Sequence, residues 1–154
     1  MEYYLNETND AVGVFDDTVT SAPPGWTDAT QEEIDAYLLE EAKATKLITL
    51  NVDREDFCYA GFAYSGNTFC LSDESTQNIV LKNTLPVGST DRYKYYDVTD
   101  VQRDFADASG WDAFFEAIIP EKDRVMRYYC ATKKEINDAA TVAAVNAIDI
   151  DFSA

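Results

Sequence analysis

The sequence contains no histidine, so the most common general base and the most common nitrogen ligand of metal ions are both missing. Its six glycines are scattered and form no glycine-rich phosphate-binding loop. A serine nucleophile, such as Ser72 or Ser75, would need an activating base that no imidazole can supply. We therefore predict a non-enzymatic protein with no catalytic residues, no cofactor-binding residues and no metal ligands.

Cysteines and long apolar runs are also scarce. Cys58, Cys70 and Cys130 are an odd number without a close pair, so we predict neither a disulfide framework nor a zinc site. We expect reduced thiols that behave as small apolar side chains. No apolar run approaches the roughly 20 residues that span a bilayer, and residues 1–7 do not resemble a signal peptide. Synthesis in a cytoplasm, without a membrane partner, is the expectation.

Basic residues are few: the sequence has 12 basic and 29 acidic residues, which gives a net charge of −17. This field repels phosphate backbones and anionic membrane surfaces, so we predict no nucleic-acid partner. Residues 1–58 hold 14 acidic and 3 basic residues, a net charge of −11. The acidity is explained most simply by solubility, and the alternative is a basic partner for this first third of the chain.

Some aspartates are spaced as cation ligands would be. Asp149 and Asp151 point the same way on an extended chain, and Asp97, Asp100 and Asp104 lie close in sequence. In a chain with 29 acidic residues such neighbours arise by chance. Solvated surfaces therefore explain both sets better than a metal site does.

What the sequence does have is enough apolar material for a core, with 46% hydrophobic and 13% aromatic residues in 154. Residues 3–5 and 11–15 flank a polar stretch and predict a β-hairpin with a five-residue loop at 6–10. Such a hairpin is only marginally stable in isolation, so another part of the protein must pack on it. Residues 21–25 contain two prolines and a glycine, which predict a rigid turn.

A capping box of Thr30 and Glu33 predicts the start of a helix. Residues 47–52 are ambiguous between a continuation of this helix and a strand. Residues 61–71 form the clearest hairpin, in which a turn at Ser65-Gly66 pairs Phe62 with Phe69 and Ala60 with Leu71.

We expect Asp73 to cap a helix that runs from Glu74 to Leu81. Residues 93–98 then predict a strand whose hairpin partner is residues 101–105.

From Ser109 onward, apolar residues at spacings of three, four and seven predict a long helix. They are Trp111, Phe114, Phe115, Ile118, Val125, Tyr129, Thr132 and Ile136. Pro120 either kinks this helix or lies in the first turn of a second one. A short helix at 141–148 and an extended end at 149–152 follow.

Together these patterns predict an α+β fold. An N-terminal hairpin arm and a helix precede a small antiparallel sheet packed on a long C-terminal helix or helical hairpin. We place the arm at residues 1–28, a connecting helix at 29–57 and a compact domain at 58–154.

The run from Gly61 to Ile79 resembles an uncharacterised domain family of bacteriophage tail proteins. Its pattern is roughly G-F-x-y-x-G-x-x-F-x-x-D-x-x-S-x-x-x-I, and Ser72 stands here in place of the aspartate. Residues 133–141 and 147–150 are similar to the end of that family, whose central aromatic corresponds to Tyr95 or Tyr96. Residues 3–28 and 32–33 resemble the opening of tail-fibre assembly and tail-fibre-associated proteins. The resemblance covers most of the chain.

The resemblance implies a structural component of a phage tail or tail fibre, made in the host bacterial cytoplasm and carried in the virion tail. Its partners would be other tail or fibre proteins. A homotrimer is the oligomer that the resemblance suggests. The alternatives are a tail-fibre assembly chaperone and a host-surface glycan-binding module, in which Tyr93, Tyr95 and Tyr96 would line a groove.

Aromatic and apolar residues of the arm and of the long helix are our candidates for partner contacts. They are Tyr3, Tyr4, Phe15, Trp26, Trp111, Phe115, Val125 and Tyr129. On the helix, an ordinary core role is the simpler explanation of most positions, and pairing with a second chain is the alternative. We expect the arm to do the docking, because it is small and acidic.

Overall fold

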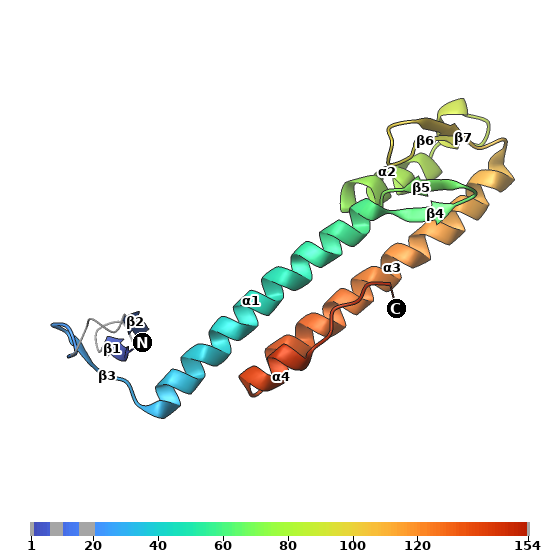
Figure 1. The fold of residues 1–154 in the computed structure, drawn as a ribbon. Helices are drawn as coiled ribbons and strands as arrows, with labels where there is room; N and C mark the ends of the chain where they lie inside the picture. Colours follow the sequence, from blue (N-terminus) through green and yellow to red (C-terminus); the bar gives the residue numbers. More distant parts are fainter. Residues whose placement is uncertain (1, 7–10, 16–20, 154) are drawn as a thin grey trace. The chain divides into compact units, whose positions relative to one another are not determined.

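The computed structural model describes residues 2–6, 11–15 and 21–153, and it confirms the α+β fold (Figure 1). The elements in chain order are β1 (Glu2–Asn6), β2 (Ala11–Phe15), β3 (Trp26–Asp28), α1 (Gln31–Ala60), β4 (Phe62–Tyr64), β5 (Asn67–Phe69), α2 (Asp73–Asn83), the 3-10 helix η1 (Thr90–Tyr93), β6 (Lys94–Tyr96), β7 (Gln102–Asp104), α3 (Ala108–Asp138) and α4 (Val142–Ala147). Among the described residues, no helix has both the length and the apolar character that crossing a bilayer requires.

The chain forms two compact units. Unit 1 comprises Met1–Leu47 and Ile136–Asp149, and unit 2 comprises Ile48–Glu135 and Ile150–Ala154. Helices α1 and α3 contribute residues to both units. The structure therefore divides the chain differently from the predicted segments 1–28, 29–57 and 58–154. The reason is that residues 47–52 continue α1 as helix, so no break falls between the second and third segments.

In unit 1, the predicted hairpin is part of a three-stranded sheet in the order β2-β1-β3. Strands β1 and β2 pair from Glu2↔Phe15 to Asn6↔Ala11, so the predicted loop is one residue too long, and residues 7–10 lie outside the described residues. Strand β3 pairs with β1 and was not predicted. A turn precedes β3, in which the Trp26 amide donates to the Pro23 carbonyl at 2.9 Å.

The capping box at the start of α1 is confirmed. The Glu33 amide donates to the Thr30 hydroxyl at 3.3 Å, and the Thr30 amide donates to the Glu33 carboxylate at 2.7 Å. The backbone hydrogen bond to Thr30 holds the pKa of Glu33 below its usual value. Each residue thus satisfies an amide that the first helical turn leaves unpaired.

In unit 2, β4 and β5 form the predicted hairpin with Phe62 opposite Phe69. Ser65 and Gly66 both have positive φ, 49° and 78°, as a tight two-residue hairpin turn requires. The predicted pairing of Ala60 with Leu71 is wrong, because Ala60 is the last residue of α1.

Helix α2 begins one residue earlier than predicted. Ser72 is the N-cap, since its Oγ accepts from the Ser75 amide at 3.2 Å. Asp73 is the first helical residue, where its negative charge meets the positive end of the helix dipole. The helix runs to Asn83, two residues beyond the predicted end.

Strands β6 and β7 form the predicted second hairpin, with both strands shorter than expected. Tyr95 pairs with Arg103, and residues 97–101 connect the strands.

Helix α3 crosses Pro120 without a break, so the alternative of a second helix starting there is wrong. Four positions of α3 spaced by seven are buried: Trp111, Ile118, Val125 and Thr132. The ring of Phe114 lies 4.7 Å from the rings of both Phe69 and Phe105, measured between centroids. The two hairpins of unit 2 therefore pack through an aromatic core on the N-terminal half of α3, and α2 lies in the same region (Figure 1).

Candidate functional site

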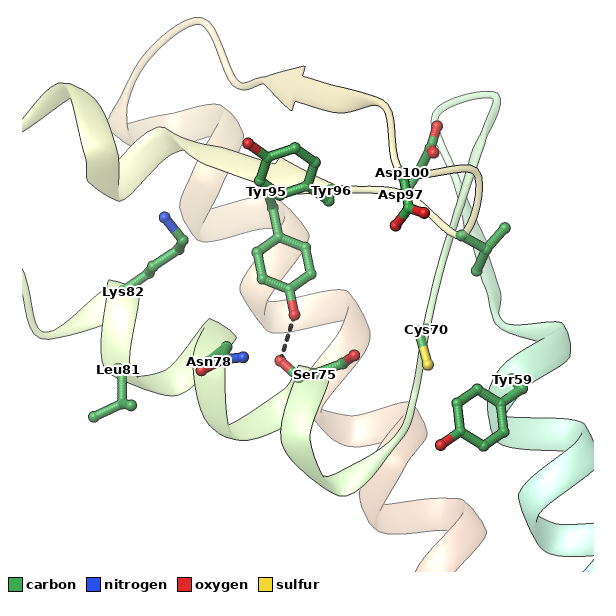
Figure 2. A pocket seen from close by; sticks show the side chains of 11 residues that line it. Tyr59, Cys70, Ser75, Asn78, Leu81, Lys82, Tyr95, Tyr96, Asp97 and Asp100 are labelled. Atoms are coloured by element: carbon green, nitrogen blue, oxygen red, sulfur yellow. Dashed lines mark hydrogen bonds between the residues drawn. The ribbon is translucent and has the colours of Figure 1, made fainter.

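Unit 2 carries a cavity of about 620 Å³, which we call the aromatic pocket (Figure 2). Its volume is within the range of ordinary ligand sites. Its walls come from the end of α1, the β5–α2 connection, α2, β6 and the turn after β6, and consist of Tyr59, Cys70, Ser75, Asn78, Leu81, Lys82, Tyr95, Tyr96, Asp97, Val98 and Asp100.

Tyr95 and Tyr96 are neighbours on β6 with different roles. Tyr95 is buried, and its hydroxyl donates to the Ser75 carbonyl at 2.6 Å, which ties β6 to α2 (Figure 2). Burial raises the pKa of Tyr95. Tyr96 is 56% exposed and Tyr59, on α1, is 65% exposed. The pocket therefore offers two accessible rings from two separate elements, above a structural tyrosine.

Asp97 organises the turn between β6 and β7. One carboxylate oxygen accepts from the Thr99 hydroxyl at 2.6 Å, the Thr99 amide at 2.9 Å and the Val101 amide at 3.2 Å. The other oxygen pairs with Arg103 at 2.5 Å. The Thr99 hydroxyl, together with Arg103 and the two amides, holds the pKa of Asp97 well below its usual range. Asp97 is thus committed to the fold, and the turn places Asp100 at the pocket with a φ of 60°.

Three polar groups of the pocket are uncommitted. Within the described part of the chain, the Tyr59 hydroxyl, the Asn78 amide and the Asp100 carboxylate have no hydrogen-bond or ion-pair partner. The one cationic side chain of the lining is engaged, since the Lys82 ammonium donates to the Asp91 carbonyl at 2.9 Å. The lining thus carries one positive charge, on Lys82, and one uncommitted carboxylate, on Asp100.

A second depression of about 550 Å³ lies between α2 and α3, and we call it the apolar groove. It is lined by Thr76, Gln77, Val80, Leu81, Ile119, Lys122, Asp123 and Met126. Val80 is 44% exposed and Leu81 is 62% exposed. Leu81 lines both the groove and the aromatic pocket, so the two depressions are neighbours.

Lys122 of α3 contacts the end of α1, the β5–α2 connection and the start of α2. Its ammonium donates to the Leu71 carbonyl at 2.8 Å, pairs with Asp73 at 2.6 Å and lies 4.0 Å from the Cys58 sulfur. The hydrogen bond from the Lys122 ammonium lowers the pKa of Asp73. Burial raises the pKa of Cys58, so its thiol is held in the weakly nucleophilic protonated form.

Four of the five aspartates considered as cation ligands have other partners, Asp149 among them, and Asp100 is the exception within the described residues. Asp97 pairs with Arg103, Asp104 accepts from the side-chain amide of Gln102 at 2.8 Å, and Asp151 accepts from the Ser153 hydroxyl at 2.6 Å. Across the described residues, no three acidic or cysteine side chains are grouped as metal ligands.

Neither depression includes any of the eight predicted contact residues. Tyr4, Trp111 and Val125 are buried within the chain and leave almost no area for a partner. Phe15 and Trp26 are half-buried in an aromatic cluster of the arm, with centroids 5.3 Å apart. The cluster follows from β3, which brings Trp26 to the hairpin.

The other predicted residues, Tyr3, Phe115 and Tyr129, are half-buried. The Tyr129 hydroxyl donates to Asn51 at 2.8 Å, and the Arg54 guanidinium lies 4.8 Å from the centre of its ring. Tyr129 is therefore engaged in contacts between α3 and α1 within unit 2.

Sequence reasoning missed Tyr59, Val80 and Leu81. For α2 a signal existed, because Ile79, Val80 and Leu81 are consecutive and cannot all face the core from one helix. For Tyr59 there was none, since its place beside β6 depends on long-range packing.

No protein-family model, no curated protein and no solved structure matches this chain.

Proposed function

We propose that this chain is a non-enzymatic docking component, which binds other proteins through the apolar groove of unit 2. The observation that carries the proposal is the pair Val80 and Leu81, two consecutive residues of α2 whose aliphatic side chains are exposed and both line the groove. Exposed apolar surface gathered at a concave site is typical of protein-binding surfaces. Burying one such side chain fully contributes about 1.5–3 kcal/mol.

The resemblance of residues 61–79 to phage tail proteins supports a partner in a phage tail or tail fibre, with the protein located in the virion. The net charge of −17 supports a protein partner with basic surface and disfavours nucleic acid and anionic membranes.

Mass spectrometry of purified phage particles tests the proposal. We expect the protein in the particle in fixed proportion to the other tail proteins. The variant Val80→Asp places a charge in the groove and should be lost from particles. The matched control is Val87→Asp, because Val87 is 74% exposed and lines neither depression. Equal incorporation of both variants would refute docking through the groove.

A tail-fibre assembly chaperone is the second proposal on the same surface. It binds fibre proteins during folding and leaves before the particle is complete. Abundance in infected cells with absence from purified particles would favour it over a virion component.

Glycan binding is the third proposal, and one observation favours it. Tyr95 and Tyr96 line the aromatic pocket as that function requires, whereas Tyr93 does not, and its hydroxyl accepts from the Gly88 amide at 3.2 Å. Binding on a glycan array that disappears in Tyr96→Ala would support this function. An array without signal would exclude it for the glycans presented.

For the oligomeric state we propose a trimer, on the resemblance to tail fibres alone. Size-exclusion chromatography with light scattering at tens of micromolar tests it. A mass of one chain, 17.2 kDa, would exclude a trimer.

A further inference from the structure

We propose that the aromatic pocket receives an arginine side chain of the partner that docks in the apolar groove. The inference rests on the proposed function and adds the chemistry of the partner.

The two accessible rings suit a planar cation. Tyr59 extends from α1 and Tyr96 from β6, so they lie on different walls of the pocket (Figure 2). A guanidinium group binds over aromatic faces by cation–π contact and by stacking, and it is more weakly hydrated than an ammonium group. Tyr59 makes no ring contact with another described residue, so its face is available to a ligand.

The uncommitted carboxylate of the pocket suits the same group. Among the described residues, Asp100 is the lining carboxylate without a partner, whereas Asp97 is held by Arg103 and the Lys82 ammonium is turned to the Asp91 carbonyl. Asp100 can accept a charge-assisted hydrogen bond from a guanidinium, and the free side-chain oxygen of Asn78 can accept another. An anionic ligand would meet a repulsive field, because the chain carries a net charge of −17.

The position of the pocket links it to the docking surface. Leu81 lines both depressions, so a segment that lies in the groove is separated from the pocket by the Leu81 side chain. Arginine is long enough to extend from the backbone of such a segment while its aliphatic part covers Leu81. Hydrophobic docking and recognition of the cation would then occur together.

The test is an NMR titration of the full-length ¹⁵N-labelled chain at low ionic strength. The probe is the peptide acetyl-Gly-Arg-Gly-amide, and its counterpart carries citrulline, which is neutral and similar in shape. We expect the arginine peptide to shift the amide signals of Tyr59, Asn78, Tyr96 and Asp100 saturably. The citrulline peptide should leave them nearly unchanged.

Two variants with the same change in net charge sharpen the test. Asn tolerates the positive φ of residue 100, so Asp100→Asn should keep the turn while weakening binding at least about fivefold, the effect of one lost charge-assisted hydrogen bond. Asp104→Asn removes an equal charge outside the pocket and should change affinity by less than about twofold. Tyr96→Leu keeps apolar volume, removes the π face and should also weaken binding.

The proposal is overturned if neither peptide shifts these signals, or if both shift them equally. It is also overturned if maltotriose shifts them and the arginine peptide does not, which would assign the pocket to a saccharide. The proposed docking function fails separately, through unchanged incorporation of Val80→Asp into particles. Full incorporation of Asp100→Asn together with a silent titration would remove only the arginine site.

Discussion

The indole nitrogen of Trp111 donates a hydrogen bond of 3.0 Å to the side-chain oxygen of Asn83, which joins the first turn of α3 to the last residue of α2. The same oxygen accepts from the Arg92 guanidinium at 3.0 Å. Trp111 is fully buried. One amide oxygen therefore satisfies two donors at the junction of α2, η1 and α3.

Replacing Asn83 should destabilise unit 2. In Asn83→Ala the Trp111 nitrogen loses its partner, and we expect the free energy of unfolding to fall by about 1–3 kcal/mol, the cost of an unpaired buried donor. Urea unfolding followed by circular dichroism measures this. The matched control is Asn78→Ala on the same helix, where the exposed side-chain amide has no partner in the described part of the chain and alanine favours helix. Equal losses in the two variants would contradict the role of Asn83.

The two glycines of the β4–β5 region should respond differently to alanine. Both have positive φ, 87° for Gly61 and 78° for Gly66, which costs an L residue about 1–2 kcal/mol. At Gly61 the added Cβ would also lie 2.8 Å from the Phe69 carbonyl oxygen, whereas at Gly66 it meets open space. Gly61→Ala should therefore lower the thermal midpoint further than Gly66→Ala. Similar midpoints would argue against close packing at Gly61.

Asp97 should make stability depend on pH. The Thr99 hydroxyl, with Arg103 and nearby amides, lowers the folded-state pKa, while the unfolded pKa stays near about 3.9. The carboxylate thus contributes stability that is present above about pH 4 and is lost as the pH falls toward the folded pKa. We expect Asp97→Asn to be less stable than the native chain at neutral pH.

The difference between Asp97→Asn and the native chain should shrink as the pH is lowered below about 4. Urea midpoints across this range measure the trend, and Asp104→Asn serves as an exposed control on the same hairpin. A difference that stays constant with pH would show that the ionised form of Asp97 is not favoured by the fold.

The capping box at Thr30 should protect the first turn of α1. In Thr30→Ala the Glu33 amide loses its acceptor, a change that costs about 1 kcal/mol of local helix stability. We expect faster hydrogen exchange at the amides of Glu33 and Ile34, which donate to Thr30. Thr30→Ser keeps the hydroxyl and should keep the protection. Unchanged exchange in the alanine variant would mean that neighbouring contacts hold this turn without the cap.

Local patterns in the sequence predicted those elements that local physics determines. The two-residue turn Ser65-Gly66 sets the register of Phe62 and Phe69, and a spacing of seven identifies the buried positions of α3. The start of α2 was wrong by one residue because Ser72 and Asp73 are both good N-caps. The choice depends on the backbone of Ser72, whose ψ of 159° is non-helical.

Features set by distant residues were not predictable in the same way. Strand β3 has three residues, too few for a visible alternation, and it forms because β1 offers a free edge. The aromatic pocket combines Tyr59 of α1 with Tyr96 of β6, residues that are far apart in the sequence and that only the tertiary fold brings to one cavity. All the predicted contact residues except Val125 were large aromatic side chains, and the size that made Trp111 a candidate also led to its burial.

Lys122 has a consequence for any association at the apolar groove. Its contacts with Leu71 and Asp73 fix the beginning of α2 against α3, and Lys122 itself lines the groove. A receptor surface that is already rigid surrenders little conformational entropy on binding, so the ordering cost falls on the incoming segment. A cyclised or otherwise stiffened ligand should therefore gain affinity over a flexible one of the same composition, while extra crosslinks within this chain should add little.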